Sequence, residues 1–234
     1  MSFRLFKLFD INVKIHITFI LLPLLFGFLY TKDYGIWVGF RAVVLVLLVF
    51  VCVLAHEFCH SLKAKKFGIF VPEITLYPIG GVASMHHIPR DPRQEFSISI
   101  VGPLFNFVSA LILFLPFYFI LGKENLFSPS LESWPQTFAN VFWVNPILGA
   151  FNLIPAFPMD GGRILRSLLA RRMNFTKATQ ISVTLGYIFA ILFVLLGVWK
   201  KHWMLIFIAI FIYHAASIEQ TQMRYENPLR NEWV

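Results

Sequence analysis

Two histidines and a glutamate stand close together in the stretch 51–68, VCVLAHEFCHSLKAKKFG. On a helix, residues four apart lie about 5–6 Å from each other on one face, so His56 and His60 can offer both imidazoles to one metal ion. Such a pair is typical of a zinc site. Glu57 lies beside His56, where its carboxylate can take a proton from a metal-bound water. The pattern predicts hydrolysis by a zinc-activated water.

The helix that must carry this motif is unusually apolar. Residues 36–55, IWVGFRAVVLVLLVFVCVLA, are apolar apart from Arg41, and about 20 such residues suffice to cross a bilayer. Ionisable groups inside a membrane cost roughly 2.5–3.5 kcal/mol each on insertion scales, so they usually mark a function. The alternative interpretation is that both histidines are structural residues of a protein core. Inside a membrane, however, no bulk water is present to hydrate two histidines and a glutamate.

The composition also indicates a membrane protein. Of 234 residues, 58% are hydrophobic and 14% charged, whereas soluble domains average about 45–50% and about 25%. The net charge of +8 could suggest a nucleic-acid partner. The basic residues cluster next to apolar stretches, however, so the positive-inside effect explains them better, and we expect no nucleic-acid binding.

The apolar stretches predict an all-α polytopic membrane protein with about six transmembrane helices and one small membrane-associated β-hairpin. The expected spans are 15–30, 36–62, 94–121, 136–170, 178–199 and 203–217. Residues 1–14 are expected to form an interfacial segment. We expect a single domain over 1–234 with a catalytic core at about 36–170 and no appended soluble domain. The basic loops predict a multi-pass cell-membrane protein with both termini and the candidate site toward the cytoplasm.

The hairpin is expected in the polar stretch that follows the second span. Residues 73–86 contain β-branched residues, Pro78 and the pair Gly80-Gly81, a pattern that favours a hairpin or a re-entrant loop. His86 and His87 come next. We interpret them as loop residues rather than ligands, because adjacent residues do not face one another on a helix.

The fourth span is interrupted. Within 136–170, Pro155, Pro158 and Gly161 prevent a continuous helix. Irregular backbone at membrane depth is tolerated only where it is buried in protein or lines a cavity. Asp160 lies in this broken stretch, so an ionisable carboxylate is expected where the chain departs from a helix.

Asp160 is the best candidate for a third zinc ligand, since a catalytic zinc site keeps three protein ligands and one open position. The alternative is that Asp160 pairs with Arg163 and caps a helix start. Three weaker candidate ligands are expected in the polar loop after the second span: Glu73, Asp91 and Glu95. Cys52 lies one turn before His56 and could be a ligand, but free cysteine more often behaves as a small hydrophobe.

Other polar or small residues in the spans have structural interpretations. His16 opens the first span and is expected at the membrane interface. Cys52 and Cys59 are about 10 Å apart along a helix, too far for a disulfide. Gly102 would allow close helix contact, and Asn106 would form a hydrogen bond to another helix.

Three segments in this order resemble the site-2 protease family of intramembrane zinc metalloproteases: HEFCH, GPLFN and NLIPAFPMDGGR. The resemblance covers about residues 10–200 and includes a Gly-Gly hairpin. It implies one Zn²⁺ per chain. The implied ligands are His56, His60 and Asp160.

The resemblance also implies roles for two further residues. Glu57 would be the catalytic base. Asn152 would lie near the site, positioning substrate or stabilising the oxyanion, and an amide donor aimed at a developing oxyanion does speed acyl transfer.

The expected function is therefore intramembrane endopeptidase activity on peptide bonds in or near transmembrane segments of membrane-associated precursors. The expected partners are a membrane-protein substrate and the bilayer, with room for an inhibitory or activating membrane partner; the oligomeric state stays open. We expect the hairpin edge at 73–86 to add the substrate as a strand. A transporter would also use a broken helix and a carboxylate, but it needs no base such as Glu57. An inactive scaffold would be free to lose Glu57.

Overall fold

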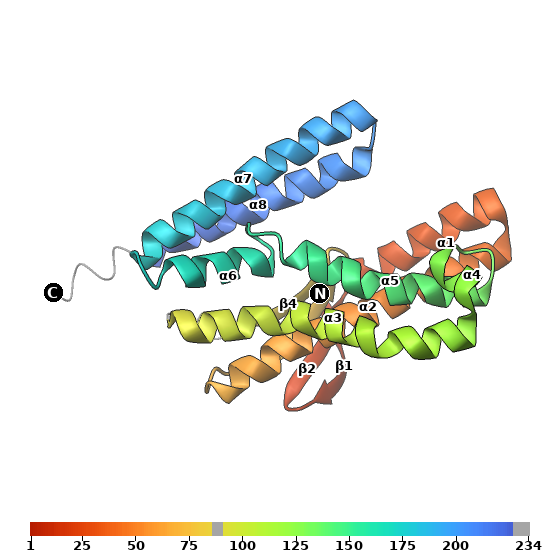
Figure 1. Ribbon diagram of the computed structural model, residues 1–234, viewed down its shortest axis with the longest axis horizontal. Helices are drawn as coiled ribbons and strands as arrows, with labels where there is room; N and C mark the ends of the chain where they lie inside the picture. Colours follow the sequence, from red (N-terminus) through yellow and green to blue (C-terminus); the bar gives the residue numbers. More distant parts are fainter. Residues whose placement is uncertain (86–90, 227–234) are drawn as a thin grey trace. The chain divides into compact units, whose positions relative to one another are not determined.

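The computed structural model of the chain describes residues 1–85 and 91–226, with side chains up to residue 221 (Figure 1). His86 and His87 lie outside the described residues, so their interpretation stays a prediction. The chain divides into two compact units. The first unit comprises Met1–Ile88 and Val101–Ala150, and the second comprises Pro89–Ile100 and Phe151–Val234.

A four-stranded sheet lies in the first unit, in the spatial order β1-β2-β3-β4. Its strands are β1 Ser2–Leu8, β2 Ile11–His16, β3 Glu73–Tyr77 and β4 Gly80–Ser84. Strand β2 runs parallel to β3, and the other neighbours are antiparallel. Because side chains alternate along a strand, Ile11 and Val13 are both fully buried, and they pack with Ile74 and with Phe58 of helix α2.

The predicted hairpin is confirmed as β3 and β4, but residues 1–14 fold differently from our expectation. They form β1 and most of β2, which the sequence did not predict, and their place at the membrane interface stays a prediction. The alternation of basic and apolar residues in SFRLFKL is a strand pattern of period two. Strand β1 is exposed along its whole length and is an edge of the sheet, as β4 is at the other side.

Long helices complete the first unit. The short η1 Ile17–Ile20 leads into α1 Leu21–Tyr34, and α2 follows as Ile36–Lys66. Contacts between α1 and α2 are extensive. Phe19, Val46 and Phe50 form a buried cluster with Leu76 of β3, so the sheet is fixed against the helix that carries the histidine pair.

Two helices contribute to both units. They are α3 Pro92–Leu121, which begins in the second unit, and α5 Trp134–Asn152, which ends in it. Between them lies the short α4 Lys123–Phe127. Ala110 of α3 packs with Leu126, Ala139 and Phe142 in a buried cluster. The segment between α3 and α5 thus includes a short helix.

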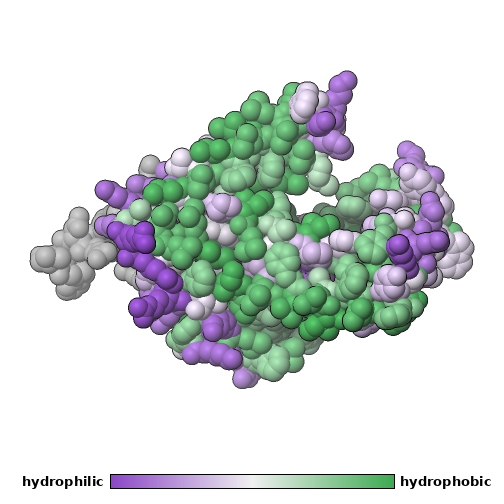
Figure 2. All heavy atoms as spheres, viewed as in Figure 1, coloured by the Kyte–Doolittle hydropathy of each residue, from purple (hydrophilic) through white to green (hydrophobic). Residues whose placement is uncertain are grey.

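The second unit contains α6 Asp160–Leu169, α7 Phe175–Lys200 and α8 Trp203–Glu226. Helices α7 and α8 lie side by side along their lengths (Figure 1). Figure 2 shows apolar side chains covering the visible face of this pair, with hydrophilic side chains at the end where α7 meets α8. That distribution fits helices surrounded by lipid, with their ends in water.

The described residues contain five helical segments long and apolar enough to cross a membrane. They are Ile17–Tyr34, Ile36–Lys66, Pro92–Leu121, Phe175–Lys200 and Trp203–Thr221. These match five of the six expected spans, so the fold class and the approximate count are confirmed. The expected fourth span is split into α5 and the amphipathic α6, and polar residues along α5 lower its hydropathy. The single-domain prediction stays a prediction.

The break between α5 and α6 is held by local hydrogen bonds rather than by helical ones. Ala156 N donates to Ile154 O at 2.7 Å, and Met159 N donates to Ala156 O at 3.1 Å. Ala156 and Met159 are buried against Ala190 and Ile212 of the helix pair. The prolines end one helix, and the loop is packed firmly enough to fix where α6 begins.

Candidate metal centre

The histidine pair lies in the last third of α2 and is almost fully buried. His56 is 3% exposed and His60 is 5% exposed. Their Nε2 atoms are 3.0 Å apart. Two nitrogens bound tetrahedrally to one zinc ion at about 2.0–2.1 Å would lie roughly 3.3 Å apart. The separation in the structure therefore fits a shared metal ion, as the spacing of four residues predicts.

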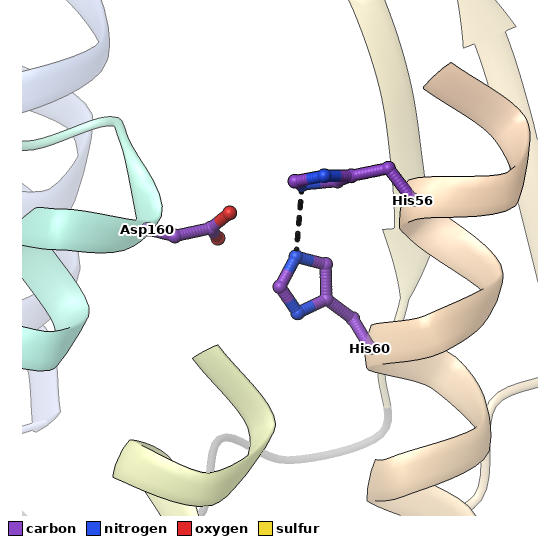
Figure 3. A group of neighbouring side chains, drawn as sticks. All are labelled: His56, His60 and Asp160. Carbon is purple, nitrogen blue, oxygen red and sulfur yellow. Dashed lines mark hydrogen bonds between the residues drawn. The ribbon is translucent and has the colours of Figure 1, made fainter. Parts of the chain in front are cut away.

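Asp160 is the first residue of α6, and Met159 is the N-cap. Asp160 thus lies one residue beyond the N-cap position. The alternative that it pairs with Arg163 at the start of the helix stays a prediction. Ligand atoms of His56, His60 and Asp160 all lie within 4.8 Å of one another. Figure 3 shows both imidazoles projecting from one side of α2 and the carboxylate projecting from the start of α6.

A glycine on α3 leaves room at the ring edges that would face a metal. An ideal Cβ built on Gly102 would lie 2.2 Å from His60 Nε2 and 2.7 Å from His56 Cε1. Real Cβ atoms do not approach so closely. The close contact expected of Gly102 is present, and what it approaches is the pair of candidate ligands. A side chain at this position would press against the nitrogen atoms that a metal would use.

His56 is hydrogen-bonded on its other nitrogen. Its Nδ1 lies 2.5 Å from Oδ1 of Asn106, on α3. Asn106 in turn donates from Nδ2 to Oδ1 of Asn145, on α5, at 3.2 Å. Ligand histidines in metal sites almost always have such a partner on the second nitrogen. The expected cross-helix bond of Asn106 is confirmed, and its partner is a candidate ligand.

The involvement of Asn145 was not predicted. For Asn106, by contrast, the sequence offers a signal. This residue follows Gly102 by four residues, so both lie on the same face of α3. A glycine and an amide on one face, opposite an apolar helix with two histidines, indicate a shared polar site. Asn145 precedes a proline and gave no comparable pattern.

Glu57 lies beside the sheet. It is half-buried, and an ideal Cβ at Gly81 would come within 2.7 Å of its Cγ. Gly81 belongs to β4, an edge strand of the sheet. The predicted hairpin therefore passes directly against the candidate catalytic base, which the sequence had placed in a different segment of the chain.

The weaker candidate ligands have other partners. Glu73 forms an ion pair with Lys14 across β2 and β3. Asp91 accepts a hydrogen bond from the backbone of Arg93 at 2.9 Å, at the start of α3. Glu95 lies within helix α3 and not in a polar loop, which corrects our expectation. None of these three belongs to the ligand cluster found in residues 1–85 and 91–221.

Glu95 belongs to a buried charged cluster in the second unit. Arg166, on α6, is 2% exposed. Its Nε and Nη2 donate to Glu95 Oε1 at 2.8 and 2.5 Å, and its Nη1 donates to Glu219 on α8. Its guanidinium also lies 4.8 Å from the ring centre of Phe157 and 4.9 Å from that of Phe175.

The remaining candidates are one asparagine, two cysteines and His16. Asn152 is the last residue of α5, and its role stays a prediction. Cys52 accepts a hydrogen bond from Asn145 Nδ2 at 3.6 Å and is not in the ligand cluster of the described residues. Both Cys52 and Cys59 are free, as predicted. His16 caps η1 and stacks on Tyr77 with ring centres 5.0 Å apart.

Comparison with known proteins assigns the chain to a family. The family model described as "Peptidase family M50" matches residues 44–133 and 129–193, which include the histidine pair, the interrupted region and Asp160. This chain belongs to peptidase family M50. The resemblance inferred from HEFCH, GPLFN and NLIPAFPMDGGR is thereby confirmed.

Individual relatives of this M50 chain agree. It is similar to a zinc metalloprotease of Methanocaldococcus jannaschii, at 37% identity over 98% of this chain and 64% of that one. It is 28% identical to the stage IV sporulation protein FB of Bacillus subtilis over 82% of this chain and 59% of that one. The solved structure of a site-2 protease from Methanocaldococcus jannaschii matches with a TM-score of 0.71 and 37% identity, covering 94% of this chain and 95% of that one.

The two curated relatives are longer than the part that aligns here. This chain spans 64% and 59% of their lengths. The fold and the family follow from the match.

Proposed function

We propose that this chain is an intramembrane zinc endopeptidase that hydrolyses peptide bonds in or near transmembrane segments of membrane-associated precursor proteins. The observation that carries the proposal is the pair of buried imidazoles of α2, with Nε2 atoms 3.0 Å apart and Glu57 beside them. These groups lie on a helix long and apolar enough to cross a bilayer, where ionisable side chains are costly without a function.

Three residues are proposed to hold one Zn²⁺ per chain: His56, His60 and Asp160. Two imidazoles and a carboxylate form a usual catalytic zinc ligand set, and it leaves one position open. Zinc in such a site activates water and polarises a carbonyl. The distance of 4.8 Å that encloses the ligand atoms supports this set, as does the space beside Gly102.

The chain's own residues would then bind and move a proton. Glu57 takes the proton from the attacking water through its carboxylate and returns it to the leaving amine. Asn152 is proposed to donate a hydrogen bond from its amide to the developing oxyanion. The near-complete burial of both imidazoles keeps bulk water from the ligand side of α2, which strengthens these interactions.

Substrate binding is proposed at the edge of β4. A transmembrane substrate must unwind before attack, and its freed backbone groups need partners in a dry environment. Strand β4 is an edge of the sheet, and its Gly81 abuts Glu57. A substrate segment added to β4 as a further strand would pass beside the base.

The setting is proposed to be a cell membrane, with both termini and the candidate site toward the cytoplasm, because basic residues follow the second and fourth apolar regions. A membrane-protein substrate and the bilayer are the proposed partners. Water would reach the zinc from the cytoplasmic side.

The test is to purify the chain in detergent, count zinc per chain, and compare wild type with Glu57→Gln. A panel of labelled transmembrane peptides in lipid vesicles serves as substrate. We expect close to one zinc in both proteins, and turnover lower by about 10²–10⁴-fold in Glu57→Gln, as for loss of a general base. Glu132→Gln, an exposed matched control, should keep full turnover. A wild-type preparation without zinc, or equal turnover in both proteins, would overturn the proposal.

The role of the β4 edge is tested by proline, which removes a backbone donor. Successive N–H groups of a strand point to opposite sides, so one of Val82→Pro and Ala83→Pro must remove an outward donor. That variant should lose cleavage and retain zinc. Leu5→Pro on β1, the opposite edge of the sheet, is the control. Unchanged cleavage in both β4 variants would remove strand addition from the proposal.

A further inference from the structure

The hydrogen bonds around His56 form a chain with a fixed direction. We propose that Asn145 and Asn106 act as positioning residues, which set the tautomer of His56 from a backbone carbonyl of α5. The inference concerns the metal-free protein. Its consequence for metal binding rests on the proposed zinc role of His56.

The participants come from three helices of the first unit and are shielded from water. His56 lies on α2, Asn106 on α3 and Asn145 on α5. Their exposed fractions are 3%, 0% and 4%. At such burial, water cannot replace a missing donor or acceptor. An amide turned the wrong way would leave groups unpaired, at about 1–3 kcal/mol each.

The chain begins at Val141. Its backbone carbonyl oxygen can only accept a hydrogen bond, and Asn145 Nδ2 lies 3.2 Å from it. The same nitrogen lies 3.6 Å from Cys52 Sγ, a weak acceptor. The amide group of Asn145 must therefore face these two atoms with its NH₂, so its Oδ1 faces the other way, toward Asn106.

The direction then passes to Asn106. Asn145 Oδ1 can only accept, so Nδ2 of Asn106 is the atom that donates to it, at 3.2 Å. Oδ1 of Asn106 is left facing His56 Nδ1, at 2.5 Å. A carbonyl oxygen has no proton to give, so the proton of this bond lies on His56 Nδ1.

A neutral imidazole carries one N–H and one lone pair. With the proton on Nδ1, the lone pair is on Nε2, the nitrogen that faces His60 at 3.0 Å. The ring is thus prepared as an Nε2 ligand before any metal arrives. If either amide were reversed, an NH₂ group would face Nδ1, and the proton would move to Nε2, where it blocks a metal.

The test uses the full chain in metal-free form, with ¹⁵N-labelled histidine. Ring nitrogen shifts distinguish the two tautomers, and a His56→Gln variant assigns the signal. In wild type we expect His56 with its proton on Nδ1. Asn106→Leu and Asn145→Leu should both shift it toward the form protonated on Nε2, by removing the acceptor or by releasing it to rotate.

The zinc dissociation constant, measured by competition with a chelator, provides the second readout. Losing an outer partner of a ligand histidine typically weakens metal binding about 10–100-fold, and we expect this for Asn106→Leu, with a smaller loss for Asn145→Leu. The matched control is Asn140→Leu, whose amide donates to Ser130 O and Gln136 O and lies outside the chain. It should change neither the ring shifts nor the affinity.

A purely structural role for the two asparagines would lower the unfolding midpoint without moving the ring shifts. A His56 that keeps its Nδ1 proton in both leucine variants, with zinc affinity unchanged, would overturn the inference. The ring shifts need neither zinc nor substrate, so this result is distinct from failure of the proposed protease function, which appears as a wild type that binds no zinc or cleaves nothing.

Discussion

The two units each hold a buried polar cluster, and the clusters differ in kind. Around His56 in the first unit, the bonds run through neutral amides from one helix to the next. Around Arg166 in the second unit, one cation is shared by two carboxylates and two aromatic rings. Amide chains have a direction, because each amide has a donor end and an acceptor end. A cluster of ions carries charge, but it does not fix which neighbouring groups donate and which accept hydrogen bonds.

The difference indicates different tasks. A ligand ring must be oriented and must keep one nitrogen unprotonated, which suits a directional chain. Helix α6 must be fixed to its neighbours, and Arg166 achieves this by reaching both Glu95 of α3 and Glu219 of α8. Since Asp160 is the first residue of α6, the second cluster sets the position of that helix within its unit.

The largest effect on stability is expected at Arg166. Replacing it by methionine leaves the buried Glu95 and the half-buried Glu219 without their cation. Removing one partner of a buried ion pair costs about 3–5 kcal/mol. The midpoint of thermal unfolding in detergent should fall markedly. The control is Arg172→Met. Arg172 is exposed and lies between α6 and α7, so this change should alter the free energy of unfolding by no more than about 0.5 kcal/mol. A similar small change for Arg166→Met would contradict the anchoring role.

The same cluster allows a sharper version of this experiment. Exchanging all three ionic groups together, by Glu95→Leu, Arg166→Met and Glu219→Leu, removes the charges that must be desolvated. Such apolar replacements are often neutral or stabilising. We expect the triple variant to unfold at a higher temperature than Arg166→Met alone. A triple variant that is less stable than the single one would show that charge itself is required.

The next effect is expected at Gly102 and concerns zinc rather than unfolding. The Cβ of Gly102→Ala would lie 2.2 Å from His60 Nε2, so the ring must move from its place beside His56. Zinc affinity should fall at least about tenfold, with an overpacking cost of about 1–3 kcal/mol. Gly27→Ala is the control, since its Cβ would lie 2.7 Å from Val43 Cγ2 and 3.9 Å from Gly39 O, and near no candidate ligand. Equal zinc affinity in both variants would place the metal elsewhere.

The smallest effect is expected at Lys14, which pairs with Glu73 between β2 and β3. Both side chains are partly exposed, at 28% and 29%, so water screens the pair and its contribution is at most about 1 kcal/mol. Lys14→Met should therefore shift the unfolding midpoint only slightly and leave zinc bound. If Lys14→Met lowered the unfolding midpoint as much as Arg166→Met, burial would not explain why the two ion pairs differ in their contribution to stability.

Much of the fold could be predicted because it rests on long local patterns. An apolar run of bilayer length fixes a helix such as α2, and the prolines at 155 and 158 fix the break before α6. The His56–His60 pair follows from helical spacing alone. Asp160 was selected as an acidic residue in the broken fourth span, and the family motif implied the same role. Spacing alone could not have paired it with residues about 100 positions away in sequence.

The polar partners were harder to predict because they depend on contacts between helices. Arg166 is one of several arginines that follow the break in the fourth span, and only packing shows that it is 2% exposed. Strand β1 was missed because its alternation of basic and apolar residues also suits a membrane interface. Asn145 has no sequence pattern of its own, and its importance comes from the atoms on either side of its amide.

The chain of amides that begins at the Val141 carbonyl has an evolutionary consequence. Its first acceptor is a peptide oxygen, which every amino acid supplies, so the side chain at 141 can vary among related proteins without disturbing His56. Positions 106 and 145 have no such freedom. Where one of them departs from asparagine in a homologue, the other should depart as well, and the pair should be inherited as a unit.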